Sequence, residues 1–224
     1  MRIAVVSKYS FYGNLIAEAL NHSRPEIVVI QSEDLKFLEG VEYFDYVFFP
    51  HFSRMIPAEL LSRCKCIGFH IGNLPTDKGG SPVQNKIIRG EYQTFVNALI
   101  LNDKIDGGDV IASSPINLEF GNIEDILTQA AKLISDLVLD IVTSDKLVTS
   151  KQTEAPVRFK RLSLEHSELD GNETTLKMMY DRIRMVDGLD YPKAFLKLGN
   201  FRIEFSNAFI GEDVLTGDCV ITRV

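Results

Sequence analysis

His70 and Asp106 are the two side chains of this chain whose types and settings best suit proton transfer. His70 follows a short apolar run, and Asp106 begins an Asp-Gly-Gly-Asp sequence that ends at Asp109. Histidine gains and loses protons near neutral pH, and a carboxylate from a separate loop can orient its ring. The two residues would suit a group-transfer site. Each also has a structural reading, as a histidine at a strand end and as a common Asp-Gly turn.

The loop Lys78–Pro82, with the sequence Lys-Gly-Gly-Ser-Pro, lies between these two residues in the chain. Its main-chain amides and its lysine could hold an anion ahead of a helix that opens at Ser81-Pro82. A flexible loop would have the same composition. We interpret the remaining histidines, His22, His51 and His166, as non-catalytic.

Three common signatures of nucleotide and hydrolase chemistry are missing. The chain has no Gly-x-x-x-x-Gly-Lys-Ser/Thr loop, no Gly-x-Gly-x-x-Gly after its first apolar run and no Gly-x-Ser-x-Gly. These absences weigh against a P-loop kinase, a nicotinamide-dependent dehydrogenase and a serine hydrolase.

The composition is that of an ordinary globular protein with an acidic balance. Hydrophobic residues make up 45% of the 224 residues and charged residues 25%, with a net charge of −7. This length fits one domain, or one domain with an appendage. The net charge gives no electrostatic footprint for a polyanion, although a local basic patch is compatible with it, so we expect no nucleic-acid partner. Small anionic substrates need only a few placed cations.

The cysteines and the N-terminus indicate a cytoplasmic protein. Cys64, Cys66 and Cys219 are odd in number, which argues against a disulfide framework, and Cys64-x-Cys66 lacks the second half of a zinc site. We therefore expect reduced thiols and no metal. The first residues are typical of a strand and not of a signal peptide, and no apolar run is long enough for a membrane span.

Apolar runs alternate with segments of helical spacing over the first 143 residues. Strands are predicted at 2–7, 26–31, 46–50, 65–70, 94–101 and 109–117, the last one broken at Pro115. Helices are predicted at 15–20, 57–63, 81–89 and 123–143, and the last has a continuous apolar stripe. This alternation favours an α/β fold with a doubly wound, mostly parallel Rossmann-like sheet, which binds ligands at the carboxyl ends of its strands.

The pattern changes beyond about residue 146. A polar loop at 149–158 precedes a helix at 173–187, a turn at 190–195, a strand at 200–208 and one or two strands at 214–224. We expect a catalytic domain at residues 1–150 and a small C-terminal extension at residues 151–224, built from a helix and a β-hairpin.

The chain resembles the folate-dependent formyltransferases over most of its first half and beyond. The residues that fall on the family pattern in order are His70, Leu74, Pro75, Lys78, Gly79, Pro82 and Asp106. The resemblance implies N10-formyltetrahydrofolate as the formyl donor, a primary amine as the acceptor and no metal. It implies that His70 stabilises the oxyanion, moves the amine proton, or both, and that Asp106 orients His70.

The same resemblance implies the residues that bind the two substrates. The segment 49–57 resembles the main chain that holds the pterin ring, and the loop 102–106 resembles the opposite wall. The implied folate contacts are Arg54, Met55, Ile56, Asp103, Ile105 and Asp109. The implied acceptor contacts are Ser10, Asn73, Lys78, Gly79, Gly80 and Tyr191.

The C-terminal part resembles formyltransferases that act on nucleotide-linked amino sugars. The segments 183–187, 191–195 and 201–205 carry this likeness. Relatives specific for tRNA have a long basic C-terminal domain, whereas this tail is short and the whole chain is acidic. We therefore expect a nucleotide-linked amino sugar as the acceptor, and a homodimer formed by the closing strands.

Gly68 is the main departure from the family pattern. Relatives place an asparagine there, two residues before the histidine, to donate a hydrogen bond to the oxyanion. Loss of such a donor costs about 2.7–4 kcal/mol in the barrier. We expect Asn97 to supply the amide, with Asn73 and Asn85 as lesser candidates. Gly72 and Asn73 also replace the usual Ser and Leu.

Two other functions stay open. One is formyl transfer to glycinamide ribonucleotide or another amine, although the first loop, Ser7–Asn14, is bulkier than the Gly-Ser-Gly-rich phosphate loop of those relatives. The other is a catalytically weakened homologue that binds folate or a sugar nucleotide, because of Gly68.

Overall fold

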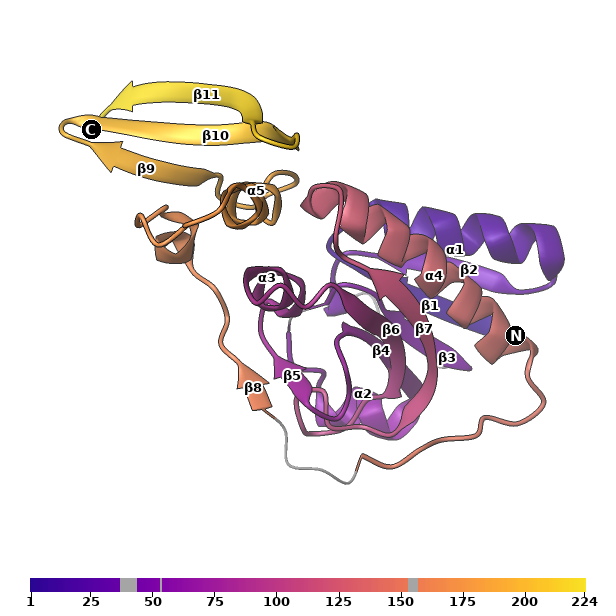
Figure 1. Ribbon diagram of the computed structural model, residues 1–224. Coiled ribbons are helices and arrows are strands. Elements are labelled where there is room, and N and C mark those ends of the chain that lie inside the picture. Colours follow the sequence, from indigo (N-terminus) through magenta and orange to yellow (C-terminus); the bar gives the residue numbers. More distant parts are fainter. Residues whose placement is uncertain (37–43, 53, 153–156) are drawn as a thin grey trace. The chain divides into compact units, whose positions relative to one another are not determined.

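The computed structural model describes residues 1–36, 44–52, 54–152 and 157–224 (Figure 1). Ser53 of the predicted pterin segment and residues 153–156 of the predicted 149–158 loop lie outside the described residues. The chain forms two compact units. The first unit contains residues 1–79, 95–116 and 129–158, and the second contains residues 80–94, 117–128 and 159–224. The domain boundary expected at residue 150 stays a prediction.

A six-stranded sheet has the strand order β2-β1-β3-β4-β6-β7 (Figure 1). Its parallel strands are β1 (Arg2–Val6), β2 (Val28–Ser32), β3 (Tyr46–Phe49) and β4 (Lys65–Ile71). The next strand, β6 (Gln93–Ile100), is antiparallel to β4, and β7 (Val110–Asn117) forms the edge. The largely parallel sheet with helices confirms the predicted α/β fold class.

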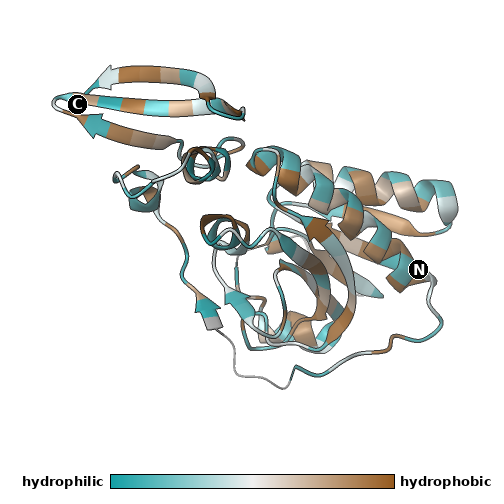
Figure 2. Ribbon diagram, in the orientation of Figure 1, coloured by the Kyte–Doolittle hydropathy of each residue, from teal (hydrophilic) through white to brown (hydrophobic). Residues whose placement is uncertain are grey.

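Continuous apolar runs explain why these strands lie in the centre of the sheet. Ile3 to Val6 of β1 and Val47 and Phe48 of β3 are each at most 1% exposed. A core cluster joins the side chains of Ala4, Val6, Phe44, Val47, Phe49, Leu60 and Cys66. Figure 2 shows the apolar colouring along these strands. Strands buried on both faces need this pattern, and each fully buried Val or Ile side chain contributes about 1.5–3 kcal/mol.

Helices α1 (Ser10–Ser23) and α4 (Ile123–Thr143) lie side by side in Figure 1, and the Ser135 hydroxyl donates to the Leu15 carbonyl at 3.1 Å. The predicted apolar stripe of α4 is confirmed, since its six residues are at most 3% exposed: Leu127, Ala130, Ala131, Ile134, Leu137 and Val138. Two short helices, α2 (Ala58–Arg63) and α3 (Pro82–Ile88), match the predicted segments 57–63 and 81–89 closely. None of the helices in the described part of the chain has the length and apolar character that a bilayer crossing requires.

Strand β7 runs through Pro115, so the predicted break at this proline is wrong. Proline has no N–H to donate, which would interrupt the hydrogen-bond ladder of a central strand. β7 is the last strand of the sheet, and one side of an edge strand makes no ladder bonds. An edge position therefore tolerates the proline.

The second unit contains α5 (Leu176–Arg184) and a three-stranded antiparallel sheet with the order β11-β10-β9. The strands are β9 (Ala194–Leu198), β10 (Phe201–Ile210) and β11 (Leu215–Arg223). The predicted turn at 190–195 is wrong at its end, because Ala194 and Phe195 begin β9. A two-residue hairpin at Gly199-Asn200 joins β9 to β10, and such a Gly-Asn pair is a hairpin signal.

Two very short strands were predicted as loop. These are β5 (Asp77–Gly79) and β8 (Val157–Phe159), which pair in a two-stranded sheet. Three residues are too few to show the alternating pattern from which strands are recognised. A short 3-10 helix, η2 (Leu164–Ser167), follows β8.

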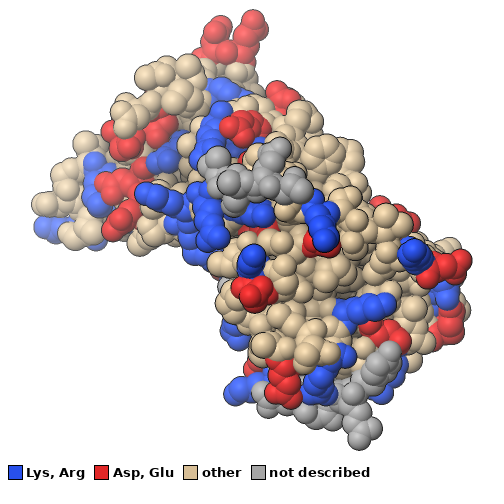
Figure 3. Space-filling model, turned by 90° about the horizontal axis from the view of Figure 1, so that it is seen from below, with Lys and Arg blue, Asp and Glu red and all other residues tan. Residues whose placement is uncertain are grey.

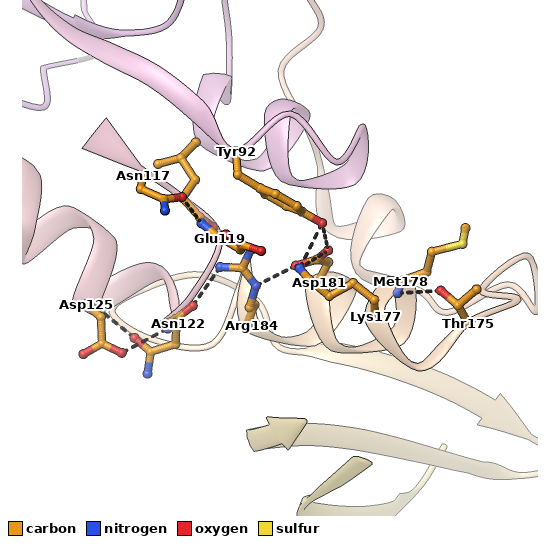
Figure 4. A network of polar contacts seen from close by, with 12 residues as sticks. Tyr92, Asn117, Glu119, Asn122, Asp125, Thr175, Lys177, Met178, Asp181 and Arg184 are labelled. Atoms are coloured by element: carbon orange, nitrogen blue, oxygen red, sulfur yellow. Dashed lines mark hydrogen bonds and ion pairs between the residues drawn. The ribbon is translucent and has the colours of Figure 1, made fainter. Parts of the chain in front are cut away.

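A buried ionic network holds α5 in the second unit (Figure 4). Arg184 is 1% exposed and donates to the Asp181 carboxylate at 2.7 Å. Its remaining N–H groups donate to the main-chain carbonyls of Leu118 at 2.6 Å and Gly121 at 2.9 Å. Asp181 also accepts from the Tyr92 hydroxyl at 2.6 Å and from Lys177 at 2.8 Å. Burial and the bond to the Asp181 carboxylate raise the pKa of Tyr92 to about 12.

We expect Arg184→Met to lower the free energy of unfolding by about 3–5 kcal/mol, because it removes a buried cation from a buried carboxylate and unpairs two carbonyls. Lys177→Met is the matched control. Lys177 is 34% exposed, so its loss should cost no more than about 1 kcal/mol. Urea unfolding followed by circular dichroism measures both, and equal losses would contradict the role given to Arg184.

Candidate active site

The structure brings His70 and Asp106 together in the first unit. His70 lies near the end of β4 and is 5% exposed, and its Nδ1 is 3.4 Å from an Asp106 carboxylate oxygen. Asp106 stands in the loop between β6 and β7 with a φ of 49°. Aspartate is one of the few non-glycine residues that tolerate this left-handed backbone. The two side chains that the sequence separates therefore share one site.

The surroundings of Asp106 keep its carboxylate charged. The Gly79 amide donates to its second oxygen at 2.9 Å. Burial raises the pKa of Asp106, but the hydrogen bond and charge of His70, the Gly79 amide and the Lys78 ammonium together outweigh burial and hold the pKa below its ordinary value. Asp106 is therefore ionised at neutral pH.

The second ring nitrogen of His70, Nε2, forms a hydrogen bond with the main-chain carbonyl of Asp77. A carbonyl can only accept, so Nε2 carries a hydrogen and Nδ1 faces the Asp106 carboxylate. A Cβ atom on Gly72 would lie 2.7 Å from Nε2 and 2.9 Å from the Asp77 carbonyl oxygen. This close approach leaves no room for a side chain at Gly72.

Asn97 lies opposite His70 in the β4–β6 pair and is 4% exposed. Its amide nitrogen donates to the carbonyls of His70 at 3.2 Å, Gly72 at 2.7 Å and Phe95 at 3.3 Å, and its oxygen accepts from Ser113 at 2.7 Å. In this arrangement the amide hydrogens point at main-chain carbonyls and not at the Nε2 side of His70. The geometry therefore supports a positioning role for Asn97.

Of the two lesser candidates for the missing amide, Asn85 has its side-chain amide engaged. The Asn85 amide donates to the carbonyls of Gly80, Ser81 and Lys160 at 3.0–3.1 Å, all within the second unit. Asn73 belongs to a turn in which its main-chain amide donates to the Asp77 carboxylate at 2.9 Å.

A leucine fills the space next to Gly68. A Cβ atom on Gly68 would lie 2.6 Å from the nearest carbon of the Leu101 side chain, and Leu101 packs against the core cluster of the first unit. An apolar group therefore occupies the volume into which the family's asparagine would project.

In the loop Lys78–Pro82 the amides of Lys78, Gly79 and Gly80 are in use. The Gly79 amide donates to Asp106, and the Gly80 amide donates to the Phe159 carbonyl at 3.1 Å. Lys78 is 8% exposed, and its charge acts on Asp106. These contacts explain the loop as support for Asp106, and its expected contacts with an acceptor stay predictions.

The residues expected to contact folate lie in two loops of the first unit. Arg54, Met55 and Ile56 follow β3, and Asp103, Ile105 and Asp109 stand between β6 and β7. Met55 is 59% exposed and Ile105 is 56% exposed. The Asp109 carbonyl accepts from the Ile100 amide at 2.9 Å, so this residue closes the β6–β7 loop.

Two expected acceptor contacts lie apart in the chain. Ser10 begins α1 and lines a hollow of about 190 Å³ together with Ser7, Tyr9 and Gln31. Tyr191 belongs to the second unit, where its amide donates to the Gly188 carbonyl at 3.3 Å.

Asp77 and Ser113 contribute to the site and were missed. Asp77 acts through its main-chain carbonyl, and Ser113 fixes the amide of Asn97. A main-chain carbonyl leaves no trace in a sequence. Ser113 stands on the strand after the Asp106 loop, and only knowledge of the pairing of β6 with β7 would have indicated it.

We expect Asp106→Asn to destabilise the protein at neutral pH and the loss to shrink in acid. A depressed folded pKa stabilises the fold fully above the unfolded pKa of about 3.9, and the contribution is lost as the pH falls through the folded pKa. Urea unfolding of both proteins between about pH 7 and pH 3 measures the difference. Asp103→Asn, at an exposed position of the same loop, is the control, and a pH-independent loss in Asp106→Asn would refute the assignment.

Residues 164–222 match the family described as methionyl-tRNA formyltransferase, C-terminal domain. The methionyl-tRNA formyltransferase of Bacillus subtilis (strain 168) is 29% identical over 194 residues, which cover 81% of this chain and 59% of that protein. The chain thus spans between 44% and 60% of the length of the curated relatives that it matches. We expected the C-terminal part to set this chain apart from tRNA-specific relatives. The match at 164–222 shows that it does not.

Two solved structures extend the likeness. An N-formyltransferase from Helicobacter canadensis, solved with folinic acid and dTDP-3-aminofucose, is 15% identical with a TM-score of 0.63 over 95% of this chain and 90% of that chain, a likeness of fold alone. A methionyl-tRNA formyltransferase from Clostridium thermocellum is 31% identical, with a TM-score of 0.89 over 100% of both chains. At that identity over the full length of both chains, this chain belongs to the formyltransferase family.

Proposed function

We propose that this chain transfers a formyl group from N10-formyltetrahydrofolate to a primary amine. The observation that carries the proposal is the contact of 3.4 Å between the buried His70 imidazole and the half-buried, ionised Asp106 carboxylate. Such a pair can hold a proton at Nδ1 and present an N–H donor at Nε2. Family membership supplies the reaction class.

In this proposal the acceptor nitrogen forms a bond to the formyl carbon, and the bond between that carbon and N10 breaks. His70 Nε2–H donates to the formyl oxygen as negative charge develops there, in the place that the Asp77 carbonyl now takes. As the bond to N10 breaks, Nε2 gives its proton to N10 and then takes up the proton that the acceptor nitrogen loses, while Nδ1 keeps its hydrogen towards Asp106, which stabilises the imidazolium. Asn97 holds the main-chain carbonyls of His70 and Gly72 and acts as a positioning residue.

Exposed apolar side chains support the folate donor. Met55 and Ile105, which stand in the two loops expected to flank the pterin ring, are each more than half exposed. Ligand pockets use apolar side chains of this kind to cover flat rings, with a few polar groups for orientation. The Helicobacter canadensis enzyme of similar fold was solved with a folate compound, folinic acid.

We further propose that the acceptor is a nucleotide-linked amino sugar. Three observations support this class: the net charge of −7, the hollow at the start of α1, and the dTDP-3-aminofucose in the Helicobacter canadensis structure. The first turn of α1 has no acidic residue, and the amides of a helix N-terminus favour phosphate. On the face shown in Figure 3, Lys and Arg are interspersed with Asp and Glu.

A second candidate acceptor is methionyl-tRNA. It is favoured by the family match at residues 164–222 and by the names of the relatives from Bacillus subtilis and Clostridium thermocellum. Glycinamide ribonucleotide is the third acceptor to be tested, although the first loop, Ser7–Asn14, lacks the Gly-Ser-Gly-rich sequence expected for that substrate.

The reaction is tested by incubating the purified protein with N10-formyltetrahydrofolate and one acceptor at a time. The acceptors are dTDP-3-aminofucose, methionyl-tRNA and glycinamide ribonucleotide, and mass spectrometry detects the gain of one formyl group. We expect the gain on the nucleotide sugar. A gain on methionyl-tRNA alone would keep the reaction and overturn the sugar acceptor, and no gain on any amine would overturn formyl transfer.

We expect His70→Ala and Asp106→Ala each to lower kcat by about 10²–10⁴-fold, because each removes a group that moves or holds the transferred proton. His22→Ala is the matched control, since His22 is exposed at the end of α1. Circular dichroism shows whether each variant is folded. Near-normal transfer by a folded His70→Ala protein would reject the assignment.

The space next to Gly68 gives a separate test of whether the oxyanion lacks a donor. We expect Gly68→Asn combined with Leu101→Ala to raise kcat about tenfold or more, because the added amide supplies a donor and the smaller residue makes room for it. Leu101→Ala alone is the control. An unchanged kcat in the double variant would show that His70 already satisfies the oxyanion.

The homodimer stays a prediction. Apolar side chains on the sheet of the second unit are exposed within one chain, including Phe209 at 71% and Ile221 at 60%. A second copy of the chain would remove such side chains from water. Light scattering of the purified protein measures the oligomeric state.

A further inference from the structure

Residues 149–152 run alongside the loop that carries Asp106. Ser150 and Val110 exchange main-chain hydrogen bonds of 2.8 and 2.9 Å. Two residues further on, the Gln152 side chain donates to the carbonyl of Asp106 at 3.0 Å and to the carbonyl of Gly108 at 2.5 Å. A glutamine amide has two hydrogens, so each finds an acceptor in this loop.

Close packing around Gly107 and Gly108 restricts the backbone of the loop that carries Asp106. A Cβ atom on Gly108 would lie 1.6 Å from the Ile100 carbonyl oxygen, and one on Gly107 would lie 2.7 Å from the Lys104 side chain. Asp106 adopts the left-handed backbone at a cost that its neighbours must offset. The two carbonyls that Gln152 holds are those on either side of Gly107, so this one side chain fixes the direction of the loop.

We propose that Gln152 is a positioning residue that holds the Asp106 carboxylate against His70 for formyl transfer. This inference rests on the proposed function, because it assigns Gln152 a part in the same reaction. Among the described residues, the Gln152 amide oxygen is buried and has no hydrogen-bond partner. Burial of this unpaired oxygen is unfavourable. The two hydrogen bonds that the Gln152 amide donates to the carbonyls of Asp106 and Gly108 offset that cost and keep the side chain on the loop.

The groups that face Asp106 decide what the loss of Gln152 would do. His70 from β4, and Lys78 and the Gly79 amide from β5, favour the charged carboxylate, whereas Asp103, Lys104 and Asp109 share its loop. If the loop relaxes, the carboxylate moves away from His70 and Gly79. The pKa of Asp106 then rises towards its ordinary value, and Nδ1 loses the group that stabilises its proton.

We expect Gln152→Ala to lower kcat about 10–100-fold and to leave KM for the formyl donor unchanged, because a small misplacement of a reacting group costs this much. Gln152→Glu, of equal length but without amide hydrogens, should lose as much. Gln129→Ala on the exposed side of α4 is the matched control and should retain full kcat. If Gln152→Ala does not fold, Gln152→Glu decides.

Two further measurements separate positioning from a general loss of structure. Nuclear magnetic resonance of the Asp106 carboxyl carbon, with pH, should show a higher pKa in Gln152→Ala than in the parent protein. In an Asp106→Asn background, Gln152→Ala should cause no further loss of kcat. Additive losses, or a pKa that stays unchanged, would overturn the inference. If the parent protein transfers no formyl group but the pKa of Asp106 is still higher in Gln152→Ala than in the parent, the proposed function is overturned. The role of Gln152 in holding Asp106 against His70 then stands.

Discussion

The contact between the half-buried Asp106 carboxylate and the buried His70 imidazole is the interaction on which the site depends. Burial disfavours the charge of Asp106, so the charge exists only where neighbours restore what water would have supplied. His70 on β4, the Gly79 amide and Lys78 on β5 do so, and together they more than offset the effect of burial on the pKa. These neighbours come from segments that meet only in the folded sheet. The charge of Asp106 therefore depends on the folded arrangement that brings these neighbours to it.

Glycines shape the site as much as its polar side chains do. A side chain at Gly72 would meet His70 Nε2 and the Asp77 carbonyl, and one at Gly108 would overlap the Ile100 carbonyl. These glycines let the main chain come close to its neighbours, which fixes the positions of His70 and Asp106. Gly68 is different, because the neighbouring Leu101 side chain occupies its free space. In the proposed reaction the oxyanion is thereby left to His70, whose Nε2 already faces an acceptor, the Asp77 carbonyl.

The sequence predicted the parts of the fold whose patterns are local. Buried strands such as β1 are continuous apolar runs, and α4 has an apolar stripe at the helical period, so both were found. The approach of His70 to Asp106 was indicated only by the family pattern, since no local pattern reports the distance between two loops. Asp77 acts through its carbonyl, and Gln152 and Asn97 act by donating to carbonyls. Every residue has a carbonyl, so these contacts give no signal in the sequence. We expected Asn97 to offer its amide to the substrate because the sequence gives no sign of the main-chain carbonyls to which this amide donates.

The charge of the chain and its similarity to known proteins favour different acceptors for the formyl group. The segment 164–222 matches a domain named for methionyl-tRNA formyltransferases, yet acidic residues outnumber basic ones within it. Proteins hold a nucleic-acid backbone by neutralising several phosphates with Lys and Arg, and the loss of those cations weakens binding steeply. A nucleotide sugar has only a few phosphate charges, which the N-terminus of α1 and one or two cations can satisfy. A shared domain is inherited whatever the acceptor, whereas surface charge acts on the acceptor directly. Charge is therefore the stronger guide to the substrate, and it favours the small one.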